Sequence, residues 1–264
     1  LLEKALMIRK LNRYRRRVER ALAIAKSMQQ RLFPSPERCK ELSEMFHIDI
    51  ESYFLTSSEL GGDLFGLRPI DRYRLGFYIL DVSGHGVGAA IETFKVHQLI
   101  EQIWTESILP SDVLRILNSK VSRSFEVGQF LTMLCGVIDL RENKMTYASA
   151  AQPPPVLLSP TESRVELAES AGFLLGVDGS ATFEDREIAF KPGDSFVSYS
   201  DALIETRNSS GHRCGEFGLR DRLEAWVKDK DTTSYFDRLV TMFEDEYLSN
   251  MNDDLTILMF TRLE

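Results

Sequence analysis

The 264-residue chain has few cysteines, no long hydrophobic run and no recognisable secretory signal. No apolar segment approaches the ~20 residues that a membrane-spanning helix needs, so an integral membrane protein is not indicated. Cys39, Cys135 and Cys214 are odd in number and lack the spacing of a metal site, which fits a reducing compartment. We therefore predict a cytoplasmic protein without membrane association. Because the chain begins with Leu, we expect it to be part of a longer protein.

The negative net charge of −8 is unevenly distributed along the chain. Residues 1–34 contain ten Lys or Arg and two Asp or Glu, whereas the remaining residues contain 22 basic and 38 acidic side chains. An acidic body argues against nucleic-acid binding. The basic segment leaves DNA or membrane binding open as a weaker alternative.

The basic segment carries a heptad stripe of apolar residues that continues to Pro34 without an internal Gly or Pro. This pattern predicts a long amphipathic helix that forms a parallel coiled coil, dimerises the protein and joins it to an upstream sensor. The alternative is a helix that packs on its own domain. Pro34 and Pro36 are expected to end it. The stripe consists of Met7, Leu11, Tyr14, Val18, Ala21, Ala25, Met28 and Leu32.

The rest of the chain alternates short strands and helices, and short turns join many of the strands. This favours antiparallel pairing and an α+β fold over a doubly wound parallel sheet. Helices are expected at 87–106, 111–125, 217–229 and 232–249. Strands are expected at 47–56, 73–81, 131–140, 144–150, 155–159, 164–168, 183–190, 195–200 and 255–262.

The stretch from Gly84 to Ala89 reads G-x-G-x-x-A after a predicted strand, which is also the pattern of a dinucleotide-binding turn. Glu101 even lies at a suitable distance along the chain for a ribose contact. However, a second helix and then a run of strands follow, instead of strictly alternating strand-helix units. A dinucleotide-dependent oxidoreductase is therefore the least favoured of the three functions considered for this chain.

Several aspartates stand beside glycines or at the ends of apolar strands: Asp63, Asp81, Asp201, Asp253 and Asp254. Any one of them could be a simple cap or turn residue. Together they predict carboxylates that converge at one edge of a sheet. Mg²⁺ and Mn²⁺ prefer such oxygen ligands.

The segments "SSELGGDLFG", "LDVSGHGVGAA", "PGDSFVSYSDALIETRN", "GEFGLRDRL" and "DDLTILMF" occur in the order found in PPM-type metal-dependent serine/threonine phosphatases. The chain resembles the bacterial branch typified by RsbU and SpoIIE over about residues 21–262. Its "AKSMQQRLFP" segment is similar to the switch-like helix before the catalytic domain of that branch. Together with the heptad stripe, the resemblance leads us to expect a helical coiled-coil segment at 1–34 and a phosphatase domain at 35–264.

The resemblance further implies a four-layer α-β-β-α sandwich of antiparallel sheets with a binuclear Mn²⁺ or Mg²⁺ site. By this similarity Asp81 would bridge both ions, and Asp63 would help to hold the site through one ion and the waters of that ion. The backbone carbonyl of Val82 would be a ligand, and Asp201 and Asp253 would complete the ligand set of the first ion. These four aspartates are accordingly the candidate catalytic residues.

The implied activity is hydrolysis of phosphoserine or phosphothreonine by a metal-activated water. The implied substrate is a phosphorylated STAS-domain anti-sigma factor antagonist in a bacterial partner-switching pathway, and the upstream partner is a sensor or receiver domain. The alternative is a degenerate phosphatase domain, a non-catalytic adaptor that binds a sigma factor or a STAS protein.

The sequence departs from the family pattern at several positions. Ala202 stands where glycine usually follows the aspartate, and strain is expected there if the backbone is left-handed. Ala151 and Gln152 replace the Gly-His of "NAGHPP", which is expected to alter substrate docking or tune activity. His85 could donate a proton to the leaving group, although packing in the glycine turn is favoured. Asp254 is expected to point outward or to support the site.

Overall fold

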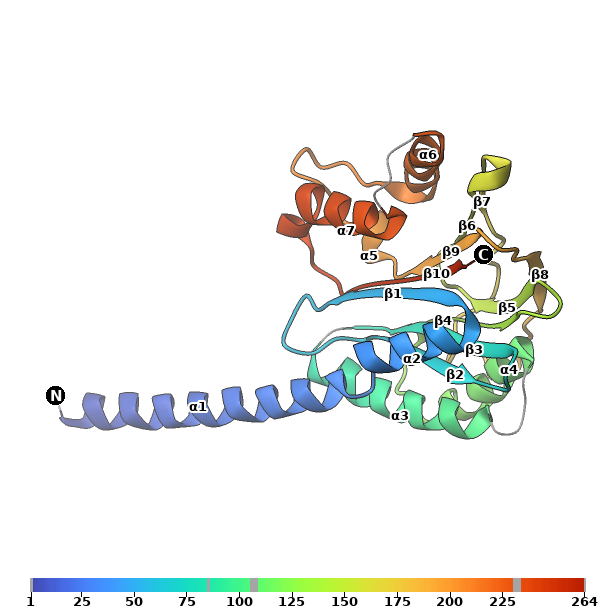
Figure 1. Cartoon of the computed structure of the whole chain (residues 1–264). Coiled ribbons are helices and arrows are strands. Elements are labelled where there is room, and N and C mark those ends of the chain that lie inside the picture. Colours follow the sequence, from blue (N-terminus) through green and yellow to red (C-terminus); the bar gives the residue numbers. More distant parts are fainter. Residues whose placement is uncertain (1, 85, 105–108, 230–233, 264) are drawn as a thin grey trace.

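The computed structural model describes residues 2–84, 86–104, 109–229 and 234–263. Within them, ten strands form two five-stranded antiparallel sheets that stack face to face, with helices on both outer faces (Figure 1). The predicted α+β fold, a four-layer α-β-β-α sandwich, is confirmed. Every described strand pairing is antiparallel, so the dinucleotide-binding topology is excluded.

The two sheets are referred to as sheet A and sheet B. Sheet A contains, in spatial order, β1 (Ile48–Leu55), β10 (Leu255–Arg262), β9 (Ser195–Tyr199), β6 (Val156–Ser159) and β7 (Arg164–Leu167). Sheet B contains β2 (Asp63–Pro69), β3 (Arg74–Val82), β4 (Leu131–Asp139), β5 (Lys144–Ala150) and β8 (Arg186–Ala189).

The strand β3 shows why the sheets are apolar on both faces. Its side chains alternate, as the twofold repeat of a strand requires. Phe77 and Ile79 join the core between the two sheets, and Phe77 contacts the ring of Phe260 from β10. Tyr78 and Leu80 join the core between sheet B and its helices. A strand buried on both faces reads as a continuous apolar run, which made β3 easy to predict.

Helices complete the two outer layers (Figure 1). Apolar side chains of α3 (Val87–Ile103) and α4 (Pro110–Val121) pack on sheet B. Those of α6 (Gly215–Lys228) and α7 (Tyr235–Glu246) pack on sheet A, together with α5 (Ala202–Glu205). Short 3₁₀ turns lie at Pro160–Glu162 and Leu248–Asn250.

The helix α1 (Leu2–Gln30) projects away from this body, and its last turns alone meet it (Figure 1). Its apolar stripe is therefore open: Met7 is 74% exposed, Leu11 65% and Tyr14 69%. Among the α1 side chains whose exposure the structure describes, Gln29 near the end of the helix is the one that is buried. Packing of the whole helix on its own domain is thus excluded. In the described residues, no helix combines the length and apolarity required to cross a membrane.

Three elements were not predicted from the sequence, and one of them is the four-residue helix α5. The prolines at 34 and 36 were interpreted as helix stops, but Pro36 begins α2 (Pro36–Phe46), in which the Ser35 side chain accepts a hydrogen bond from the Arg38 amide. Serine followed by proline is a helix-start signal, because the first turn needs no amide from the proline. The strand β2 was also missed.

The glycine-rich turn before α3 has the conformation that its sequence indicated. Gly84 and Gly86 have φ of +93° and +77°, a region that glycine adopts without strain. Gly88 lies inside α3, where an added Cβ would meet no described atom within 4 Å, so close helix packing does not explain it. His85 lies outside the described residues, and its predicted roles stay untested.

Backbone strain falls at Ala151 and not at Ala202. Ala202 begins α5 with a helical backbone, so alanine is tolerated there. Ala151, directly after β5, has φ of +56° in the left-handed region. A side chain in that region costs about 1–2 kcal/mol. The strain anticipated for one family departure therefore belongs to the other.

Replacing Ala151 with Gly should raise the free energy of unfolding by about 0.5–1 kcal/mol, because glycine relieves the left-handed strain but gains entropy when unfolded. Urea denaturation measures this change. The control Ala150→Gly, one residue earlier in β5, should instead destabilise by about 1 kcal/mol. Equal destabilisation by both variants would contradict the assignment of strain to Ala151.

Candidate metal centre

The two sheets bring the candidate aspartates to one end of the sandwich. Asp63 begins β2 and Asp81 lies at the end of β3, and the two residues are directly opposite in the antiparallel register. Asp201 follows β9, and Asp253 precedes β10, which is antiparallel to β9. The start of one strand therefore lies beside the end of its neighbour in both sheets. The predicted convergence at a sheet edge is what the topology produces.

Hydrogen bonds join the two sheets at this end. Asp63 is 1% exposed, and its Oδ2 accepts a hydrogen bond from the Thr256 hydroxyl of β10 at 2.7 Å. Thr256 is held in turn by Ser200, whose Oγ accepts from the Thr256 amide at 2.9 Å. This chain of contacts fixes the Asp63 carboxylate relative to the strand end that leads to Asp201.

Asp254 is buried, at 2% exposure, and does not point outward. Its Oδ1 accepts hydrogen bonds from the amide and hydroxyl of Ser57, at 2.7 and 3.1 Å. Its Oδ2 accepts from the Gly62 amide at 2.7 Å. Asp254 therefore ties the start of β10 to the segment that precedes Asp63, so it supports the site.

Gly61 and Gly62 allow this close approach. A Cβ on Gly61 would collide with the Asp254 carboxylate, and one on Gly62 would lie 2.5 Å from the Val82 carbonyl oxygen and 3.1 Å from Asp81 Oδ1. Contacts under 3.0 Å require atoms to move. The glycine pair thus keeps space open beside Asp81 and the Val82 carbonyl.

The electrostatics of the cluster are those of crowded like charges. Burial, followed by repulsion from Asp81, raises the pKa of Asp63 well above its usual range. Burial, followed by repulsion from Asp201 and Asp253, does the same for Asp81. For Asp201, burial and repulsion from Asp253 raise the pKa to about 6. The folded chain is thus least stable when these groups are all ionised.

The donor set suits a hard divalent cation, since carboxylate and carbonyl oxygens are the ligands that Mg²⁺ and Mn²⁺ take. Cations in this space would also offset the repulsion that, after burial, raises the three pKa values. In the part of the chain that the structure describes, no three His, Cys, Asp or Glu side chains are already gathered around a single point as ligands of one ion. The site fits a metal by its chemistry and charge.

The structural part played by Gln152 was not predicted. Its side chain is 2% exposed and so does not face a docking substrate directly. The Gln152 Oε1 accepts from the Thr132 hydroxyl at 2.7 Å, and its Nε2 donates to the Tyr199 carbonyl at 3.0 Å. Thr132 is paired with Asp81, and Tyr199 lies two residues before Asp201. Gln152 therefore joins the strand ends that carry these two aspartates.

A second contact links the site to the projecting helix. The buried Gln29 of α1 donates from Nε2 to the Gly61 carbonyl at 2.6 Å and accepts from the Gly61 amide at 3.2 Å. Gly61 lies two residues before Asp63. No sequence signal pointed to this pair, because 32 residues separate its members.

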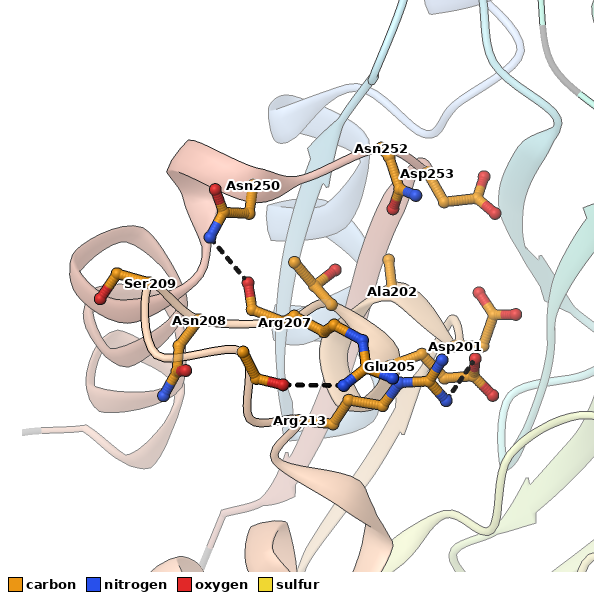
Figure 2. A pocket seen from close by; sticks show the side chains of 12 residues that line it. Asp201, Ala202, Glu205, Arg207, Asn208, Ser209, Arg213, Asn250, Asn252 and Asp253 are labelled. Carbon is orange, nitrogen blue, oxygen red and sulfur yellow. Dashed lines mark hydrogen bonds and ion pairs between the residues drawn. The ribbon is translucent and has the colours of Figure 1, made fainter.

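A pocket opens beside the aspartates. Asp201 and Asp253 form part of its wall, and Figure 2 shows them with Arg207 and Arg213 from the segment after α5. The cavity has a volume of about 530 Å³. Its position next to two candidate ligands gives a substrate room to approach them.

Two antiparallel sheets, flanked by helices and carrying acidic residues at one end, define the PP2C-type phosphatase fold. The structure titled "SiaA-PP2C domain of Pseudomonas aeruginosa" superposes with a TM-score of 0.78 at 18% identity, over 94% of this chain and 97% of that one. The PP2C phosphatase domain of SpoIIE from Bacillus subtilis, solved with a fragment of its regulatory domain, gives a TM-score of 0.67 at 17% identity, over 82% of this chain and 63% of that one. These two similarities concern the fold alone.

The family profile described as "Stage II sporulation protein E (SpoIIE)" matches residues 71–263. The chain therefore belongs to the SpoIIE family, as its motifs predicted.

Two curated relatives come from Bacillus subtilis (strain 168). Phosphoserine phosphatase RsbU is 23% identical over 249 residues, which cover 93% of this chain and 71% of RsbU. Phosphoserine phosphatase RsbP is 28% identical over 162 residues, which cover 60% of this chain but 40% of RsbP. The chain thus corresponds to less than half of the length of RsbP.

The raised pKa of Asp201 predicts how the stability of the metal-free chain depends on pH. An unfolded aspartate titrates near 3.9, whereas folded Asp201 titrates at about 6, so protonation favours the folded state. This stabilisation is complete below about pH 4 and is lost as the pH rises through 6. In chelator, unfolding should become easier between pH 4 and 8 by roughly 1–2 kcal/mol for Asp201, after allowance for solvent screening.

In chelator, the unfolding temperature of Asp201→Asn should depend less on pH than that of the wild type. At pH 8, Mn²⁺ should remove the difference in unfolding temperature between the two proteins. Glu51→Gln is a matched control, because burial, followed by repulsion from Asp49 and Asp237, raises the pKa of Glu51 to about 7 without a contribution from the candidate metal ligands. The part of the pH dependence that Glu51→Gln removes should be the same with and without Mn²⁺. If the part that Asp201→Asn removes is also unchanged by Mn²⁺, this result would contradict a cation site here.

Proposed function

We propose that the chain is a metal-dependent protein phosphatase that hydrolyses phosphoserine or phosphothreonine with a metal-activated water. The observation that carries this proposal is the meeting of Asp63, Asp81, Asp201 and Asp253 at one end of the sandwich. Burial, followed by mutual repulsion, raises the pKa of Asp63, Asp81 and Asp201. Such a cluster attracts divalent cations strongly.

In this proposal the side chains of Asp63, Asp81, Asp201 and Asp253 and the carbonyl of Val82 would hold two Mn²⁺ or Mg²⁺ ions. Asp81 would serve as a ligand of both. When bound, the ions lower the pKa of a water so that it can attack phosphorus, and they offset the charge of the phosphoryl group.

The chain's own residues hold these ligands in place. Thr256 orients the Asp63 carboxylate, and Asp254 holds the Gly62 amide and with it the start of β2. Burial of Asp63 keeps bulk water from competing for its oxygens. In such a medium the attraction between a carboxylate and a cation is stronger than in water.

Cysteine chemistry is a poor alternative. Burial raises the pKa of all three thiols, Cys39, Cys135 and Cys214, which disfavours the nucleophilic thiolate. A water nucleophile needs no such residue, so the proposed mechanism is compatible with this chain.

The proposed substrate is a phosphorylated STAS-domain anti-sigma factor antagonist in a partner-switching pathway. The names of RsbU and RsbP, both phosphoserine phosphatases, support the class of substrate. One similar structure is titled "The bacterial stressosome: a modular system that has been adapted to control secondary messenger signaling", and it supports a regulatory setting.

The helix α1 is the proposed dimerisation and control element, with residues 1–34 as a helical segment and 35–264 as the phosphatase domain. Its open apolar stripe supports a parallel coiled coil with a second copy, and an upstream sensor or receiver domain would act on that coil. The Gln29–Gly61 contact offers a direct route, because a shift of α1 would move the backbone that precedes Asp63.

Replacing Leu11 and Val18 with Glu should convert a dimer into a monomer, because two charges would enter the apolar seam. Light scattering after size-exclusion chromatography measures the mass. The paired control Asn12→Glu with Ala23→Glu adds the same charge to exposed positions off the stripe and should leave a dimer. An unchanged mass for the Leu11 and Val18 variant would contradict the coiled coil.

The activity is tested by phosphate release from p-nitrophenyl phosphate with Mn²⁺ and with chelator. Asp81→Asn should lower the Mn²⁺-dependent rate by about 10²-fold or more, because it removes the charge shared by both ions. Asp71→Asn is the control, since Asp71 lies in the turn at the opposite end of β2 and β3. It should retain the wild-type rate.

A non-catalytic adaptor that binds a sigma factor or a STAS protein is the second candidate. It is favoured by the absence, within the described residues, of side chains already gathered around one metal position. Absence of both metal-dependent hydrolysis and Mn²⁺ binding in the same sample would support the adaptor and overturn the phosphatase.

A further inference from the structure

The pocket beside Asp201 and Asp253 is built from two segments that run close to the carboxylates. The residues after α5 form one wall, and the residues from Asn250 to Asp253 form the other (Figure 2). Its volume of about 530 Å³ is sufficient for more than one side chain of a bound peptide. A phosphoserine at the aspartates would therefore have its neighbouring residues at the mouth of this pocket.

The loop that carries the pocket's arginines is well ordered by hydrogen bonds. Arg207 and Arg213 face each other across an isolated antiparallel bridge. Between them the Asn208 amide donates to the His212 carbonyl at 2.8 Å, and Asn208 Oδ1 accepts from the His212 amide at 2.9 Å. Asn250 Nδ2 donates to the Arg207 carbonyl at 3.0 Å, which fixes the loop to the opposite wall. The arginines are thus held in place before any ligand arrives.

This arrangement leaves a positive charge without a carboxylate. Residues that are opposite in an antiparallel pair project to the same face, and two like charges there repel. Glu205 lies 3.3 Å from Arg213 and offsets one of them. The Arg207 guanidinium donates to the Gly211 carbonyl at 2.7 Å, and no carboxylate among the described residues forms an ion pair with it. Arg207 therefore retains donors and charge for an external anion.

We propose that this pocket recognises an acidic side chain of the phosphoprotein substrate, close in sequence to the phosphorylated residue. Arg207 would bind the substrate carboxylate directly, whereas Arg213 is already paired with Glu205. An extended peptide advances ~3.3–3.6 Å per residue, so a residue near the phosphoserine can enter a pocket that shares Asp201 and Asp253 with the site. This inference rests on the proposed phosphatase function and adds a rule for substrate choice.

The test compares two phosphoserine peptides that differ only beside the phosphoserine, with Glu residues in one and Gln residues in the other. p-Nitrophenyl phosphate is the third substrate, because it has no flanking residue. The whole chain is assayed with Mn²⁺. The wild type should have a kcat/KM about tenfold higher for the Glu peptide than for the Gln peptide, mainly through KM. High salt should reduce the preference, since Arg207 is exposed.

Variants then assign the preference to the pocket. Arg207→Gln should lower kcat/KM for the Glu peptide at least fivefold more than for p-nitrophenyl phosphate, and Arg207→Lys should keep most of the preference. Arg207→Glu should reverse the choice in favour of a further peptide that has Lys residues beside the phosphoserine. Misfolding cannot produce such a gain. The control Arg115→Ala removes an exposed arginine that pairs with Asp112 on α4, and it should leave the preference unchanged.

The outcomes separate the two proposals. If p-nitrophenyl phosphate is hydrolysed but the wild type shows no preference for the Glu peptide, the pocket proposal is overturned and the phosphatase stands. A preference that survives Arg207→Gln and Arg207→Glu overturns it as well. If no substrate is hydrolysed with Mn²⁺, the proposed function itself fails, and the substrate rule fails with it.

Discussion

Electrostatic repulsion among four crowded carboxylates, of which Asp63 is buried and Asp81, Asp201 and Asp253 are half-buried, is the constraint on which the rest of the structure depends. Asp63 and Asp81 are opposite each other at a strand end, and Asp201 and Asp253 meet them from the second sheet. Such a group costs free energy when ionised, as the raised pKa values indicate. A chain that needed only stability would place apolar residues there. The cost becomes intelligible if the cluster exists to hold cations for phosphoryl chemistry.

The segment around Gly61 and Gly62 links this cluster to the rest of the molecule. Asp254 holds the Gly62 amide, while the Thr93 hydroxyl of α3 donates to the Gly62 carbonyl at 3.0 Å. Gln29 of α1 holds Gly61. Three elements that are distant in sequence therefore determine where β2 begins and where Asp63 lies. A displacement of α1 has a short mechanical path to a candidate metal ligand.

Much of this architecture could be predicted because its signals are local or periodic. Apolar strands such as β3 and the heptad stripe of α1 are visible in the sequence, and aspartates at strand ends indicated a shared edge. The missed features depend on contacts between distant residues. Pro36 was interpreted as a stop when Ser35 caps a new helix. The buried positions of Asp254 and Gln152 follow from partners in the other sheet, which no spacing in the sequence reveals.

The most direct test of the account is a calorimetric titration of the whole chain with Mn²⁺. The account predicts binding of two ions per chain, accompanied by proton release because carboxylates of raised pKa must ionise. Asp81→Asn should abolish at least one of the two binding events, since this residue is the proposed shared ligand. Absence of Mn²⁺ binding by the wild type, or two unaltered binding events in Asp81→Asn, would contradict the assignment of these aspartates as a metal centre.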